Sequence, residues 1–127
     1  MRPIPTAVFT KEASGPASMA YVFYPTAAGS ECAITKIEPL TVSGAVGMAI
    51  HFANGRTDYF VQADAPGKVS FASYEMDGQA AYVRVEGGKV VKALLAGGTK
   101  ITQAGKPLEA EILELKDLSQ TETTHKF

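Results

Sequence analysis

Turn-forming residue pairs recur about every ten residues through the middle of this 127-residue chain, with short β-forming stretches between them. Each pair contains glycine, which adopts the positive φ that tight hairpin turns require. Regular turn signals of this kind are typical of an all-β sandwich or barrel. We therefore expect an all-β fold, an antiparallel two-layer β-sandwich built from hairpins, with little or no helix. The predicted turns are Asn54-Gly55, Pro66-Gly67, Asp77-Gly78 and Gly87-Gly88, with further bends at Gly97-Gly98 and Ala104-Gly105.

The stretch from 46 to 61 gives the most detailed prediction. Apolar residues occupy every second position from Val46 to Phe52, so they share one face of a strand. A two-residue type I′ turn at Asn54-Gly55 would place Phe52 opposite Thr57, and His51 opposite Asp58 on the other face. The His51–Asp58 pair could be a general base held by a carboxylate, but the sequence places no nucleophile beside it. We favour a surface cross-strand pair.

The remaining strands follow from alternation and from the turn positions. We expect one domain over residues 1–118, followed by a polar tail over 119–127. The segment 108–112 also fits helical spacing, so a short helix is the lesser alternative there. The segment 17–24 is apolar on both faces, which predicts a strand buried on both sides or covered by a neighbouring domain. Further strands are expected at 31–37, ended by Pro39, and at 68–74, 79–86, 89–95, 99–102 and 108–112, with an edge strand at 6–9.

Composition excludes several classes of protein. The net charge of −1 argues against a dedicated nucleic-acid-binding domain. No apolar run approaches the roughly 20 residues that a membrane helix needs. Cys32 is the single cysteine and most resembles a small core residue, and the two histidines lie far apart, so we predict no disulfide, metal site or cofactor. The N-terminus lacks an apolar signal-peptide core, which indicates a cytoplasmic protein or part of a longer secreted chain.

Positive charge gathers in one part of the chain. Residues 79–106 carry five basic side chains against one acidic side chain, whereas residues 107–127 are acidic. Such a basic segment can attract an acidic polymer, although lysines also commonly protect the edges of β-sheets from aggregation. Tyr82 and Arg84 share one strand face within this segment. Together with Lys92 they are the candidate substrate-binding residues, and no residue is assigned a catalytic role.

The order of several short motifs carries a family resemblance. In sequence these are the stretch from Pro3 to Glu12, Tyr21-Val-Phe-Tyr-Pro25, Gly55-Arg-Thr-Asp-Tyr-Phe60, Asp77-Gly-Gln-Ala-Ala-Tyr-Val-Arg84, and Gly97-Gly-Thr-Lys-Ile101 with Gly105 behind it. This succession resembles the C-terminal β-sandwich region of heparinase II/III-like polysaccharide lyases and covers nearly the whole chain.

The resemblance implies a role within a larger enzyme. In that family an α-helical toroid precedes the β region, and the whole protein cleaves acidic polysaccharides such as glycosaminoglycans or alginate by β-elimination. The family's catalytic motifs map onto no residue of this chain. The expectation is therefore a non-catalytic domain that supports the toroid and the substrate cleft, in the periplasm or secreted with its parent. The alternative is a stand-alone carbohydrate-binding module for acidic glycans.

Overall fold

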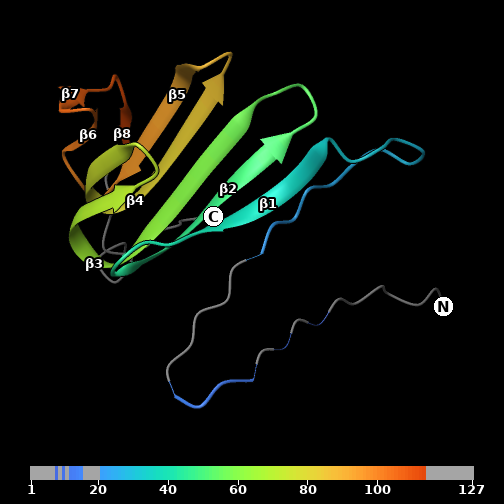
Figure 1. Cartoon of the computed structure of the whole chain (residues 1–127), viewed down its shortest axis with the longest axis horizontal. Helices are drawn as coiled ribbons and strands as arrows, with labels where there is room; N and C mark the ends of the chain where they lie inside the picture. Colours follow the sequence, from blue (N-terminus) through green and yellow to red (C-terminus); the bar gives the residue numbers. More distant parts are fainter. Residues whose placement is uncertain (1–7, 9, 11, 16–20, 114–127) are drawn as a thin grey trace, which may run out of the picture.

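A computed structural model describes residues 8, 10, 12–15 and 21–113 of the chain. Eight strands and no helix occur within these residues, so the all-β prediction is confirmed. All eight strands belong to one hydrogen-bonded sheet (Figure 1), and the division into two layers stays a prediction. The strands are β1 (Ile34–Leu40), β2 (Ala45–Phe52), β3 (Thr57–Phe71), β4 (Tyr74–Glu86), β5 (Lys89–Ala96), β6 (Lys100–Gln103), β7 (Lys106–Pro107) and β8 (Glu111–Leu113).

The sheet is a meander with a branch. The main order is β1-β2-β3-β4-β5-β8, and β6 pairs with the start of β4 and with β7. Every pairing is antiparallel except that between β5 and β8, which run parallel over three residues. The strand predicted over 108–112 is therefore present only as the short β8, and no helix forms there. Pro107 is the last residue of the two-residue β7, which precedes β8 in the chain.

Two long strands form the centre and bend together at a corner. The first half of β3 pairs with the second half of β4, and beyond an irregularity between Gln62 and Gly67 the pairing resumes as far as the Phe71–Tyr74 turn. Bulged positions of this kind let strands turn sharply. The Gln79 side chain donates to the Ala63 carbonyl at this corner, at 3.1 Å. The sheet therefore curls, and the rings of Tyr59 and Tyr74 meet at 5.7 Å between centroids.

The core lies on the inner side of this curl. Along β3 the buried side chains alternate regularly, whereas in β4 they change from even to odd positions across the corner. The irregularity sets four residues of β3, 63–66, against the single residue Gln79 of β4, and this odd shift in register keeps the apolar side chains of both strands on the inside of the bend. The largest fully buried side chains are Phe71, Met76, Leu95, Ile101, Val61 and Val83.

The predicted turn at Asp77-Gly78 is wrong, and so is the one at Pro66-Gly67. Both pairs lie inside long strands, at the corner. The chain reverses instead at Ala72-Ser73, where Ala72 has a φ of 50°. Glycine serves here for close packing, because a Cβ on Gly78 would come within 2.9 Å of Leu95.

The hairpin between β2 and β3 has the predicted position but a different loop. The Gly55 N–H donates to the Phe52 carbonyl and the Phe52 N–H to the Arg56 carbonyl, which makes a three-residue loop with Gly55 at a φ of 85°. The extra residue shifts the register by one, so His51 pairs with Thr57 and not with Asp58. The predicted turn at Gly87-Gly88 is present, with Val85 paired to Val90. A bulge beyond it places Leu95 opposite Ala81.

The strands predicted in the N-terminal third of the chain differ from those in the structure. Residues 21–24, which belong to the strand predicted over 17–24, form no strand, and Phe23 is 70% exposed. The strand predicted over 31–37 runs instead from Ile34 to Leu40, through Pro39. A proline fits there because β1 lies at the edge of the sheet. The other half of the 17–24 prediction, most of the strand at 6–9 and the tail at 119–127 lie outside the described residues.

Candidate functional site

A buried carboxylate lies on the sheet face opposite the core. Paired residues in an antiparallel sheet share a face, so the register places Asp58 beside Ile50 of β2 and Arg84 of β4. We call this side of β2–β5 the outer face. Asp58 is 4% exposed and is the only buried charged residue in the described part of the chain. A buried charge is costly unless it is paired and hydrogen-bonded, so its partners identify the candidate site.

Two side chains of β4 hold this carboxylate. Arg84 Nε donates to Asp58 Oδ1 at 3.2 Å, and the Tyr82 hydroxyl donates to Asp58 Oδ2. Arg84 also donates to the Tyr82 hydroxyl oxygen at 2.8 Å, which closes a three-membered network. Because β3 and β4 are adjacent strands with Asp58 opposite Arg84, the sheet itself fixes this geometry.

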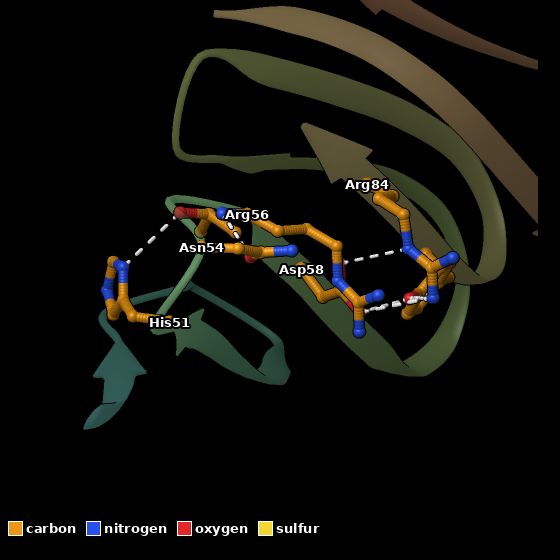
Figure 2. A network of polar contacts seen from close by, with 7 residues as sticks. His51, Asn54, Arg56, Asp58 and Arg84 are labelled. Carbon is orange, nitrogen blue, oxygen red and sulfur yellow. Dashed lines mark hydrogen bonds and ion pairs between the residues drawn. The ribbon is translucent and has the colours of Figure 1, made fainter. Parts of the chain in front are cut away.

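A second arginine approaches the carboxylate from the hairpin loop. Arg56 Nε lies 3.3 Å from Asp58 Oδ1, and Figure 2 shows Asp58 between the two guanidinium groups. This Nε is buried and makes no well-aligned hydrogen bond, so the contact is an ion pair. The Arg56 guanidinium also lies over the Phe52 ring, 3.8 Å from its centroid, and Tyr24 contacts the same ring edge-on. Residues 52–58 are therefore fixed around the acid.

The site has a surplus of positive charge. Two guanidinium groups face one carboxylate, and the register sets the exposed Lys92 of β5 opposite Arg84. Burial would lower the pKa of Arg84, but hydrogen bonds to Asp58 and Tyr82 reverse this effect and raise it. Burial and the hydrogen bond to Asp58 raise the pKa of Tyr82 above its ordinary value. Tyr82 is therefore a neutral donor at physiological pH, and Arg84 is a cation.

An apolar hollow adjoins the network on the same face. It has a volume of about 150 Å³ and is lined by Phe60, Ala80, Ala81, Tyr82, Leu94 and Ala96. Phe60 lies opposite Tyr82 and is 37% exposed. The ring of Tyr82 thus forms one side of the hollow while its hydroxyl group belongs to the charged network. The arrangement can receive a partner that is apolar at one end and anionic at the other.

The structure brings the predicted site residues together. Tyr82, Arg84 and Lys92 do share one face, but Tyr82 and Arg84 are bonded to Asp58, which the sequence had assigned to His51. His51 contacts Thr57 and Glu38 instead, with 3.6 Å between Nε2 and a Glu38 carboxylate oxygen, and it points away from Asp58 in Figure 2. The predicted surface pair of His51 with Asp58 is therefore wrong, and so is the general-base alternative that depends on the same pairing.

Other candidate chemistry is limited within the described residues. No group of three or more histidine, cysteine, aspartate or glutamate side chains in this part of the chain could hold a metal ion. Cys32 is exposed and not in the core, which corrects its predicted burial. None of the described segments is a helix capable of spanning a membrane. A second, polar hollow lies between the Ala72-Ser73 turn and the Ala104-Gly105 turn and includes Ser70 and Thr102.

Comparisons with known proteins add no relative. No protein-family model, no curated protein and no solved structure matches this chain. The functional argument therefore depends on the residues of the outer face.

Sequence reasoning paired Asp58 with the wrong residue and missed Arg56. The observed register sets Asp58 opposite the apolar Ile50, and a carboxylate buried there needs a cationic partner. The partner could not be identified, because the pairing of Asp58 with Arg84 depends on the turn at Ala72-Ser73, which contains no glycine.

Proposed function

We propose that this chain is a non-catalytic accessory domain of a polysaccharide-acting protein, and that its outer face docks against the catalytic part of that protein. The observation that carries the proposal is the apolar hollow around Phe60, set beside a carboxylate whose charge is already compensated. The order of motifs resembling heparinase II/III-like lyases supports the identity of the larger protein. On that basis the partner is a helical toroid, and the complete protein acts on an acidic polysaccharide outside the cytoplasm.

The compensated charge suits a face that another protein covers. Removing an isolated carboxylate from water is prohibitive, but Asp58 already has hydrogen bonds from Tyr82 and Arg84 and an ion pair with Arg56. Covering it further therefore requires little additional desolvation. The hollow supplies apolar area, which contributes roughly 25 cal/mol per Å² when it is removed from water. A partner with an apolar side chain for the hollow would gain both surface burial and shape complementarity.

The test uses the catalytic domain encoded in the same protein or beside it. We expect a purified helical domain from that reading frame to bind this chain, and Phe60→Asp to weaken binding at least about tenfold, because a carboxylate would enter an apolar contact. Val91→Asp is the matched control, since Val91 is 54% exposed and lies at the bulge in β5, outside the hollow. Circular dichroism verifies folding of both variants. Equal binding by the two variants, or a reading frame without a helical catalytic domain, would refute the proposal.

A second candidate function has its own observation. The surplus of positive charge from Arg56, Arg84 and the exposed Lys92 fits an acidic glycan, whose carboxylate or sulfate groups accept charge-assisted hydrogen bonds. Arginine has five N–H donors, so its bonds to Asp58 do not exhaust its capacity. In this function Asp58 orients Arg84 for a ligand.

Direct binding to heparin, heparan sulfate and alginate separates the two functions. A glycan-binding module predicts micromolar affinity that falls with added salt and weakens several-fold in Lys92→Ala. Lys68→Ala is the control, because Lys68 is exposed on β3 beyond the corner. Arg84→Ala and Tyr82→Ala serve as secondary variants, since each also disturbs the buried acid. Millimolar affinity, or none, favours the docking function.

A further inference from the structure

The exposed edge of β1 carries a pattern that is complementary to itself. β1 pairs with β2 on one side and with no other strand in the described residues, so one edge of the sheet is unpaired. Ile37 lies near the middle of β1 and is 46% exposed. Lys36 precedes it and Glu38 follows it, and the two side chains share a face with 3.0 Å between Lys36 Nζ and Glu38 Oε2.

The proline in β1 shows which backbone groups face the edge. Pro39 lies opposite Met48 but has no N–H to donate to β2, so its nitrogen occupies a position directed away from the ladder. Backbone groups of alternate residues in a strand point the same way. The N–H and C=O groups of Ile37 are therefore directed outward as well. They are available to a further strand.

We propose that β1 pairs antiparallel with β1 of a second copy of this chain, centred on Ile37. Two-fold symmetry then makes the contact isologous, with Ile37 opposite the partner's Ile37 and its two backbone hydrogen bonds exchanged reciprocally. In this register Lys36 lies opposite the partner's Glu38, and Glu38 opposite the partner's Lys36. Both cross-strand pairs are of opposite charge.

Charge complementarity selects this occupant over another strand. Centring the pairing on Lys36 or Glu38 would set like residues opposite each other, whereas the Ile37 register alternates cations and anions over four side chains. Ile37 also lies opposite Ile50 of β2, so the two Ile37 side chains at the dimer axis would have an apolar neighbour on either side. Pro39 limits the pairing to a few residues, because its missing N–H leaves one position without a bond. The resulting dimer is concentration-dependent and not obligate.

Charge-reversal variants test the register directly. We expect the full chain to dimerise reversibly in sedimentation velocity, and Lys36→Glu or Glu38→Lys alone to weaken dimerisation about tenfold or more, because each places like charges opposite each other twice per dimer. The double variant that exchanges both charges should restore the dimer. An equimolar mixture of the two single variants should form a heterodimer in native mass spectrometry, because an all-acidic edge then meets an all-basic one.

The controls separate this edge from other surfaces. Lys92→Glu changes an exposed lysine on β5 and should leave dimerisation unchanged. A wild-type chain that stays monomeric up to about 1 mM overturns the proposal, because a specific dimer of this kind would have a Kd below that concentration. A dimer that is indifferent to the single reversals, or a mixture of single variants without heterodimer, also overturns it, because the contact would then lie elsewhere. Circular dichroism excludes unfolding as the cause of any loss.

Discussion

Replacing Gly98 with alanine should destabilise the fold more than any other glycine-to-alanine change in the described chain. A Cβ at this position would lie 2.0 Å from the Asp77 carbonyl oxygen and 2.4 Å from the Gly78 Cα. Real Cβ atoms essentially never approach within 3.0 Å, so the backbone of β4 must move by about 1 Å. The hydrogen bond from the Thr99 N–H to the Asp77 carbonyl, 2.9 Å long, joins these same segments and would be lost with the movement.

The expected magnitude follows from what surrounds each glycine. Overpacking typically costs about 1–3 kcal/mol, and a clash with backbone cannot be relieved by a rotamer change, so we expect at least about 3 kcal/mol for Gly98→Ala. Gly78→Ala should cost about 1–2 kcal/mol, because its closest contact is the flexible end of Leu95 at 2.9 Å. Gly67→Ala meets nothing within 4 Å and should change stability by less than about 1 kcal/mol.

Urea unfolding followed by circular dichroism measures this series. A loss of about 3 kcal/mol is a large part of the roughly 5–15 kcal/mol that stabilises most domains, so the midpoint for Gly98→Ala should fall clearly. The order Gly98, Gly78, Gly67 matters more than any single value. If the free energy of unfolding of Gly98→Ala lies within about 0.5 kcal/mol of the wild-type value, the two backbones do not approach each other this closely at the corner.

Three further outcomes follow from the central strands. Arg84→Ala should destabilise the fold by about 3 kcal/mol by leaving the Asp58 carboxylate buried with one cation fewer, and adding Asp58→Asn should recover part of that loss, as measured by urea unfolding. The raised pKa of Tyr82 means that the folded state binds the phenol proton more tightly than the unfolded state does. The stability that this difference contributes is complete below about pH 10 and is lost as the pH rises further. Tyr82→Phe should flatten this alkaline loss of stability, and an unchanged pH profile would contradict the role given to the Tyr82 hydroxyl. Ala72→Gly should raise the free energy of unfolding by up to about 1 kcal/mol, because the φ of 50° at Ala72 strains a residue with a Cβ. A lowered free energy of unfolding would count against that turn.

Sequence reasoning succeeded where the turn is encoded locally. Gly87-Gly88 and Ala104-Gly105 reverse the chain with the positive φ angles that these pairs suggest, at 57° and 77° in the first case. The all-β class followed from such turns and from the alternation of apolar residues in segments such as β2. These are local properties, and local pattern is sufficient to predict them.

Sequence reasoning failed where a glycine is required for close packing and does not form a turn. Asp77-Gly78 has the composition of a hairpin turn, yet Gly78 lies in a strand because Gly98 packs against its Cα. That contact joins residues twenty positions apart and is invisible to a local pattern. The reversal at Ala72-Ser73 was missed for the complementary reason, since alanine is a poor choice for a positive φ and gives no turn signal.

The prediction of the site was wrong because the loop between β2 and β3 is one residue longer than expected. A two-residue loop at Asn54-Gly55 would set Asp58 beside His51, whereas the observed three-residue loop turns Asp58 to the opposite face. A shift of one residue moves every side chain of a strand to the other side of the sheet. The same shift brings Asp58 to Tyr82 and Arg84, so a single loop residue converts an apparent catalytic pair into a buried charged network.

The position of that network limits what the outer face can do. Asp58 occupies the middle of the sheet, between β2 and β4, and its partners come from a loop and from the neighbouring strand. Moving Arg84 toward a ligand would therefore leave the Asp58 carboxylate buried with one cation fewer, which costs several kcal/mol. A ligand must instead use the donors of Arg84 that already face outward, or bind at the hollow and at Lys92. For this reason Phe60 and Lys92, which make none of the hydrogen bonds or ion pairs described for Asp58, are the informative positions for distinguishing a docking face from a glycan site.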